Sequence, residues 1–125
     1  GKQAVVIAWF PKAFTGGCTA ECKSFRENSA LLKGTNVAYF TASTDDQKTN
    51  ADFAKSLDLD YPILCDPDRK VGMAYGVVAA PTGFAKRWTF YIDKDGVIRE
   101  IDKMIKTGQA GKDAVAKLKT LGIVN

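Results

Sequence analysis

One stretch of the sequence brings together the residue types that thiol chemistry needs. It contains Pro11, Thr15, Cys18 and Cys22, with a pair of glycines just before Cys18. A cysteine attacks only as its thiolate, and an ordinary thiol of pKa about 8.5 is only a few per cent ionised at neutral pH. The unpaired N–H groups and positive dipole end of a helix N-terminus stabilise such an anion. The pattern therefore predicts a nucleophile at Cys18, with the Thr15 hydroxyl able to donate to the sulfur or to an oxygen bound near it.

The segments on either side of this stretch predict how it is held. Residues 4–10 are apolar throughout, which is typical of a strand buried on both faces. Pro11 cannot continue the hydrogen-bond ladder of that strand, so the strand is expected to end there. The two glycines allow a sharp turn into a helix expected over residues 18–32, which places Cys18 in the first helical turn. The stripe of that helix that we expect to face the core consists of Cys22, Phe25, Ser29 and Leu32.

The remaining patterns predict an α/β architecture. Strands are expected at residues 37–42, 61–65, 87–92 and 96–101, and helices after the polar loop 43–46, at 69–75 and at 112–121. This order predicts a sheet covered by helices on both faces. We found no repeat, linker or low-complexity tract, so residues 1–125 are interpreted as a single domain.

Composition excludes several classes of function. The net charge of +4 comes from scattered lysines, so we expect no nucleic-acid partner, and no apolar run approaches the roughly 20 residues that span a bilayer. The absence of histidine removes Ser-His-Asp and Cys-His catalysis and the commonest zinc ligand. Residues 93–96 resemble part of a calcium loop but lack its other ligands and are interpreted as a turn. We therefore expect neither a metal nor a cofactor.

The cysteine count bears on the redox environment. Three cysteines are too few for a secreted disulfide scaffold, and an odd count indicates reactive thiols. No signal peptide is visible, and we expect a cytoplasmic protein, although a targeting segment could have been removed together with other N-terminal residues.

The spacing Pro-x-x-x-Thr-x-x-Cys over residues 11–18 is the signature of the peroxiredoxins. The flanking residues 9–12 and 17–19 resemble most closely the bacterioferritin-comigratory (PrxQ) branch of the AhpC/TSA superfamily, and residues 61–67 resemble another part of the same family. The resemblance covers nearly the whole chain and implies a thioredoxin-like fold with a central mixed sheet. The chain starts almost inside its first core strand, so the N-terminal hairpin usual in the family is expected to be absent.

The resemblance implies a thiol-dependent peroxidase that reduces hydrogen peroxide and organic hydroperoxides through a cysteine sulfenic acid at Cys18. Thr15 and the backbone N–H of Cys18 would hold the peroxide oxygens, and Pro11 would shield the sulfur from water. A cation is also needed beside the thiolate, and Arg87 is predicted in that role because its strand resembles the arginine-bearing strand of the family. Glu21 is predicted to orient Arg87.

A second thiol must resolve the sulfenic acid, and two internal candidates are open. Cys22 lies four residues after Cys18, whereas the PrxQ branch usually has its helical resolving cysteine five residues on. Residues at this spacing in a helix have Cβ atoms about 5–6 Å apart, while a disulfide needs roughly 3.8 Å, so the first turn would have to unwind. Cys65 is the other candidate, and an external thiol would act if neither resolves.

The partners expected from the resemblance are a peroxide and a reductant, either thioredoxin or a similar dithiol protein, with the chain a monomer or weak homodimer. Two other functions remain open. A disulfide oxidoreductase would need Cys-x-x-Cys at the helix start, whereas Cys18 and Cys22 are separated by three residues. A thioredoxin-fold redox sensor or binding module without turnover is the second, and the complete set of Pro11, Thr15, Cys18 and Arg87 argues against it.

Overall fold

The computed structural model describes residues 3–34 and 37–123 and centres on a five-stranded mixed sheet of order β3-β2-β1-β4-β5. β1, β2 and β3 are parallel, whereas β4 is antiparallel to β1 and β5 is antiparallel to β4. The carboxyl ends of the three parallel strands and the amino end of β4 therefore share one edge of the sheet. The strands are Ala4–Trp9 (β1), Val37–Ser43 (β2), Ile63–Cys65 (β3), Thr89–Ile92 (β4) and Ile98–Asp102 (β5).

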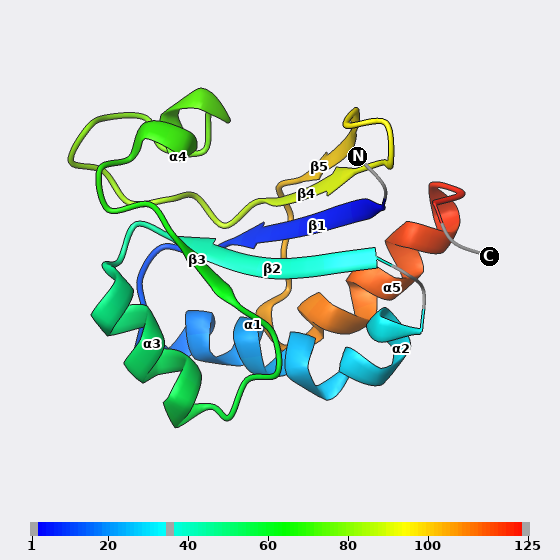
Figure 1. Ribbon diagram of the computed structural model, residues 1–125, viewed down its shortest axis with the longest axis horizontal. Helices are drawn as coiled ribbons and strands as arrows, with labels where there is room; N and C mark the ends of the chain where they lie inside the picture. Colours follow the sequence, from blue (N-terminus) through cyan, green and yellow to red (C-terminus); the bar gives the residue numbers. More distant parts are fainter. Residues whose placement is uncertain (1–2, 35–36, 124–125) are drawn as a thin grey trace.

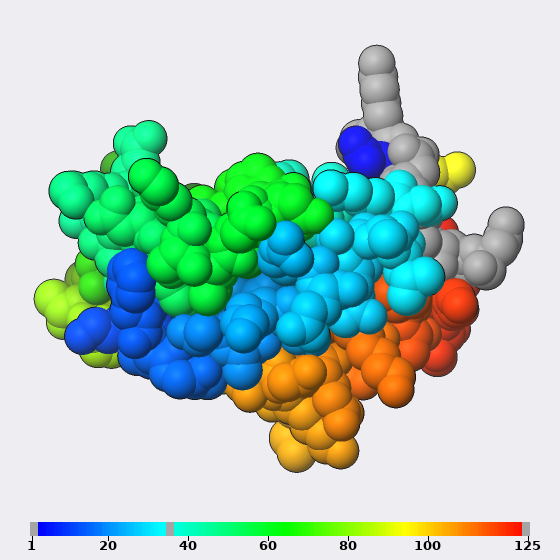
Figure 2. Space-filling view, turned by 90° about the horizontal axis from the view of Figure 1, so that it is seen from below, coloured from blue at the N-terminus to red at the C-terminus, as the bar shows by residue number. Residues whose placement is uncertain are grey.

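Helices lie on both faces of the sheet, as the sequence predicts, but the two layers are unequal. Figure 1 shows α1, α2, α3 and α5 below the sheet and the short α4 above it. Figure 2 views the lower layer directly, where α1 in blue lies between α3 in green and α5 in orange. The helices are α1 (Gly16–Glu27), α2 (Ser29–Lys33), α3 (Gln47–Ser56), α4 (Lys70–Ala74), the 3-10 helix η1 (Thr107–Gln109) and α5 (Ala110–Thr120).

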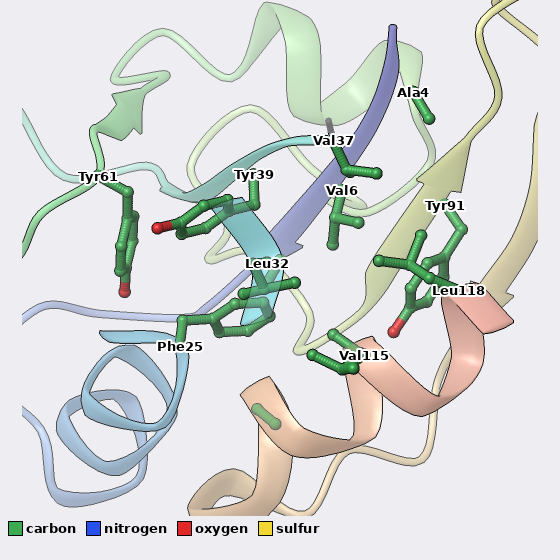
Figure 3. Packing of buried hydrophobic residues seen from close by; sticks show 13 residues of the cluster. Ala4, Val6, Phe25, Leu32, Val37, Tyr39, Tyr61, Tyr91, Val115 and Leu118 are labelled. Carbon is green, nitrogen blue, oxygen red and sulfur yellow. The ribbon is translucent and has the colours of Figure 1, made fainter. Parts of the chain in front are cut away.

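The alternation of side chains along β1 divides the core into two layers. Val6 and Ala8 point toward the lower helices, where Figure 3 shows Val6 above Phe25, Leu32 and Leu118. Burying each large apolar side chain of this layer contributes about 1.5–3 kcal/mol. The opposite face of the sheet packs against α4 and the loop that follows it, through Trp9, Ala42, Val77, Val78, Ala85 and Phe90.

The position of α1 is fixed by a close crossing with α5. The N–H of Gly111 donates to Ser24 Oγ at 2.8 Å, and a Cβ atom on Gly111 would lie 2.3 Å from Ser24 O. Only glycine allows so close a backbone approach. This crossing holds α1, and with it Cys18, against the lower face of the sheet.

The prediction of a single helix over residues 18–32 is wrong in two respects, because the observed helix starts before residue 18 and is interrupted before residue 32. It begins earlier, at Gly16, and it breaks at Asn28 into α1 and α2. At the break, Ser24 O accepts both the backbone N–H of Asn28 at 3.2 Å and the Asn28 side-chain amide at 2.8 Å, a local side-chain bond of the kind that favours helix ends. The stripe residues Cys22, Phe25 and Leu32 are nevertheless all fully buried, as expected.

Several strand boundaries also differ from the prediction. β4 begins at Thr89 rather than at Arg87, because the N–H of Trp88 donates locally to Lys86 O instead of to a neighbouring strand. β3 begins only after Pro62, which has no N–H for the ladder. β5 likewise begins at Ile98, two residues later than predicted. Within the described residues, no helix combines the length and the apolar character that crossing a membrane requires.

Candidate active site

The candidate active site begins where β1 ends, in a segment we call the catalytic loop, residues 11–15. The N–H of Phe10 still donates to Ala42 O at 2.8 Å, and Pro11 then leads the chain away from the sheet. The loop turns sharply at Phe14, whose φ of 63° is a left-handed conformation uncommon for a residue with a side chain. The catalytic loop therefore depends on contacts from elsewhere in the protein to keep its shape.

Thr15 links the catalytic loop to α1. Its hydroxyl donates to Lys12 O at 2.8 Å, and its carbonyl accepts the N–H of Thr19 at 2.9 Å as the first bond of the helix. The N–H groups of Gly17 and Cys18 precede that bond and so have no acceptor within α1. They form an anion-stabilising helix end at Cys18, as the sequence predicts.

Arg87 joins Cys18 to Glu21. One guanidinium nitrogen lies 3.5 Å from Cys18 Sγ, and the other donates to Glu21 Oε1 at 2.6 Å. A Cβ atom on Gly17 would lie 3.0 Å from the guanidinium, so the glycine leaves room for the arginine to reach the sulfur. The structure thus brings Arg87 into contact with Glu21 and Cys18, which precede it in the sequence by 66 and 69 positions.

The electrostatics of this trio follow from burial. The side chain of Glu21 has no exposed surface, and that of Arg87 is 24% exposed. Burial raises the pKa of Glu21 to about 7, although the hydrogen bond and charge of Arg87 oppose the increase. Burial lowers the pKa of Arg87, but the hydrogen bonds and charges of Glu21 and Cys18 together outweigh burial and leave that pKa above its ordinary value. The guanidinium therefore stays charged beside the sulfur.

The Glu21 carboxyl should make stability depend on pH. Its pKa of about 7 exceeds the ordinary 4.5, so the folded protein binds more protons than the unfolded chain between these values. The free energy of unfolding should therefore fall as pH rises through this window, by up to about 3 kcal/mol from this group. In Glu21→Gln this pH-dependent change in the free energy of unfolding should vanish. Denaturant titrations of wild type and Glu21→Gln at pH 4.5 and 7.5 measure the difference. Parallel pH profiles would contradict the prediction.

Comparison with known proteins identifies the family. Residues 1–101 match the AhpC/TSA family. The chain belongs to this family. Peroxiredoxin Bcp of Escherichia coli is 32% identical over 111 residues, which cover 84% of this chain and 71% of that protein. Alkyl hydroperoxide reductase E of Mycobacterium tuberculosis is 33% identical over 101 residues, which cover 79% of this chain and 66% of that protein.

A solved structure agrees with this assignment. Peroxidoxin BcpB from Mycobacterium tuberculosis matches with a TM-score of 0.86 at 29% identity, over 96% of this chain and 80% of that chain. The fold is therefore the thioredoxin-like fold of the peroxiredoxins, and the protein is a thiol-dependent peroxidase. These findings favour the peroxidase over a disulfide oxidoreductase and over a module without turnover.

Cys22 is enclosed in this peroxiredoxin. Its side chain is fully buried, and its thiol donates weakly to Thr41 Oγ1 at 3.8 Å. The hydroxyl of Tyr61 donates to the Cys22 carbonyl at 2.8 Å, which ties the first turns of α1 to the loop before β3. Burial, reinforced by the charge of Glu21, raises the pKa of Cys22 to about 12. In the folded helix Cys22 is therefore protonated at neutral pH.

Cys65 has the opposite surroundings. It is exposed at the end of β3, which β2 separates from β1, and its sulfur accepts a hydrogen bond from Asn50 at 3.5 Å. No disulfide joins Cys18, Cys22 and Cys65 in the part of the chain that the structure describes. The structure therefore offers two resolving candidates with opposite properties. Cys22 lies four residues from Cys18 but is buried, whereas Cys65 is accessible but lies at the end of β3.

One contact to the catalytic loop was missed by sequence reasoning. The N–H of Ala13 donates to Asp45 Oδ2 at 2.8 Å, from the loop after β2. At residues 43–46 the sequence indicates only a polar loop before a helix, and Asp46 caps that helix by accepting the N–H of Thr49 at 2.8 Å. The contact of Asp45 with the catalytic loop could have been inferred from the position of these polar residues, which directly follow a buried strand parallel to β1.

Proposed function

We propose that Cys18 is the nucleophile of this peroxidase and that Arg87 is its cationic partner. The observation that carries the proposal is the guanidinium that lies 3.5 Å from Cys18 Sγ while buried Glu21 holds its other end. A fixed cation beside the sulfur stabilises the thiolate and also the negative charge that develops on the peroxide oxygens. In this proposal Glu21 orients Arg87, and half-buried Pro11 keeps water from the sulfur.

The reaction transfers one oxygen atom to Cys18. The thiolate attacks one oxygen of the peroxide, so that an S–O bond forms while the O–O bond breaks. The second oxygen leaves with the bonding electron pair and takes up a proton, giving water from hydrogen peroxide or an alcohol from an organic hydroperoxide. Cys18 becomes a sulfenic acid, oxidised by two electrons.

Two groups of the helix end are proposed to hold the peroxide. The backbone N–H of Cys18 has no acceptor within α1 and can donate to a peroxide oxygen. The Thr15 hydroxyl uses its hydrogen on Lys12 O, so it can accept the O–H of the peroxide while it keeps that bond. This assignment makes Thr15 an acceptor in the resting geometry rather than the donor that the sequence suggests.

For the second half of the cycle we propose that Cys22 resolves the sulfenic acid. Because Cys22 is buried and its pKa is about 12, it can attack only after the first turns of α1 unwind and expose it. The two glycines that open α1 favour such unwinding, since glycine tolerates many backbone conformations. The Cys22 thiol then forms a disulfide with Cys18 and water leaves. Cys65 and an external thiol remain the alternative resolving groups.

We further propose that a dithiol protein of the thioredoxin type completes the cycle, because a Cys18–Cys22 disulfide is reduced by exchange with two thiols. A cytoplasmic location, where such dithiols are kept reduced, fits this cycle. A monomer or weak homodimer would leave the edge that carries Cys18 free for the reductant.

The matched variants Cys22→Ser and Cys65→Ser test this cycle. After one equivalent of peroxide, wild type should contain a Cys18–Cys22 disulfide that thioredoxin reduces, as mass spectrometry of the digested protein would show. Cys22→Ser should stop at Cys18 sulfenic acid and overoxidise more readily, while Cys65→Ser should cycle within about 2-fold of wild type. The reverse pattern would make Cys65 the resolving thiol, and turnover of both variants would assign resolution to an external thiol.

A further inference from the structure

The bond between Ala13 and Asp45 connects two parts of the sequence that are 32 positions apart. β1 and β2 are paired in parallel register up to Trp9 and Ala42, so the loops that follow them leave the sheet side by side. Asp45 therefore lies beside the catalytic loop and accepts a backbone N–H from its middle. A backbone donor makes this contact independent of the side chain at position 13.

The Asp45 carboxylate is itself held in place. The Ser43 hydroxyl donates to the same Oδ2 atom at 2.8 Å and accepts the backbone N–H of Asp45 at 3.2 Å. The side-chain amide of Asn50 donates to that hydroxyl at 2.9 Å. Ser43 and Asn50 are buried, with 0% and 2% exposure. The carboxylate is therefore oriented before any substrate arrives, as a group that fixes reaction geometry must be.

The residue after Ala13 shows why the catalytic loop needs this support. Phe14 has a φ of 63°, a conformation that costs a residue with a side chain free energy and persists only where surrounding contacts enforce it. Its ring packs on Phe53 of α3 with centroids 5.0 Å apart, which holds the side chain. The Asp45 contact holds the backbone on the other side of the strained residue. Thr15, the N-cap of α1, follows directly.

We propose that Asp45 is a positioning residue for peroxide reduction, which fixes the catalytic loop so that Thr15 and the Cys18 N–H face the peroxide together. The inference rests on the proposed role of Cys18. Asp45 does not touch the sulfur in this role and acts through the Ala13 backbone. Loss of the carboxylate lets Phe14 relax and moves Thr15, while Arg87 and Glu21 remain beside Cys18.

The test separates positioning from activation of the thiol. Asp45→Ala should slow the reaction of Cys18 with hydrogen peroxide by about 10- to 100-fold in stopped flow, because small displacements of reacting groups have effects of this size. Alkylation of Cys18 by iodoacetamide, which has no O–O bond to align, should stay within about 2-fold of wild type. Asp45→Asn keeps an oxygen that can accept the Ala13 N–H and should recover most of the loss.

The neighbouring carboxylate gives the matched control. Asp46→Ala removes the cap of α3 without touching the catalytic loop, so it should lose stability but keep the peroxide rate within about 2-fold. If Asp45→Ala does not fold, Ser43→Ala replaces it and should show a smaller loss of the same kind. A peroxide rate unchanged in Asp45→Ala, or a parallel loss of alkylation, would overturn the inference. A wild-type rate no faster than that of a free thiol would instead remove the proposed nucleophile itself.

Discussion

Cys18→Ser is expected to reduce peroxide consumption by at least about 1,000-fold, to the level of the reductant alone. The serine hydroxyl is hardly ionised at neutral pH and does not form the sulfenic acid on which the cycle depends. The measurement is the loss of hydrogen peroxide with dithiothreitol as reductant, which bypasses any requirement for a particular partner.

The control for this variant is Cys65→Ser, in which an exposed cysteine is changed in the same way. It should retain turnover within about 2-fold of wild type, because its substitution leaves the active site intact. Substantial turnover by Cys18→Ser would move the nucleophile to Cys22 or Cys65. Circular dichroism of both variants confirms that each is folded.

Arg87→Met is expected to slow peroxide attack by about 100- to 1,000-fold, the usual effect of removing one group that stabilises transition-state charge. Methionine fills similar space but leaves Cys18 without its cation. It also leaves the Glu21 carboxyl buried without its partner, which costs stability until that carboxyl takes up a proton. The double variant Arg87→Met/Glu21→Gln should therefore recover stability and remain slow.

Arg26 supplies the matched control for the arginine variant. It lies on α1, eight residues after Cys18, but its guanidinium bonds to Asp58 at 3.1 Å in an exposed pair rather than to the sulfur. Arg26→Met should keep the rate of peroxide attack within about 2-fold, since an exposed pair contributes little. Equal slowing by both arginine variants would show that the overall positive charge around α1 matters, rather than the contact at Arg87.

Local sequence chemistry predicts the parts of this site that lie along one element. The apolar run of β1, the proline that ends it and the glycines that open α1 are sufficient to place Cys18 in a first helical turn, as the structure has it. Glu21 follows one turn later on the same helix. Arg87 could be proposed from resemblance and from the need for a cation, and the structure confirms its contact with the sulfur and Glu21.

The features that the sequence did not reveal depend on contacts between distant segments. At the break, the Asn28 side chain turns back to Ser24, and helical periodicity does not report that contact. The contact of Asp45 with Ala13 depends on the register of β1 and β2. The raised pKa of Cys22 follows from burial, which a stripe of apolar positions suggests but does not quantify. Each of these requires the folded chain.

Stopped-flow measurement of the reaction of reduced protein with hydrogen peroxide tests the central claim most directly, with free cysteine measured in the same buffer and corrected for its thiolate fraction. Alignment of the peroxide by the helix end and Arg87 predicts a second-order rate constant at least about 1,000-fold above that of the free thiolate. The rate should fall in Arg87→Met and be lost in Cys18→Ser. A wild-type rate within about 10-fold of the free thiolate would contradict a site built for peroxide reduction.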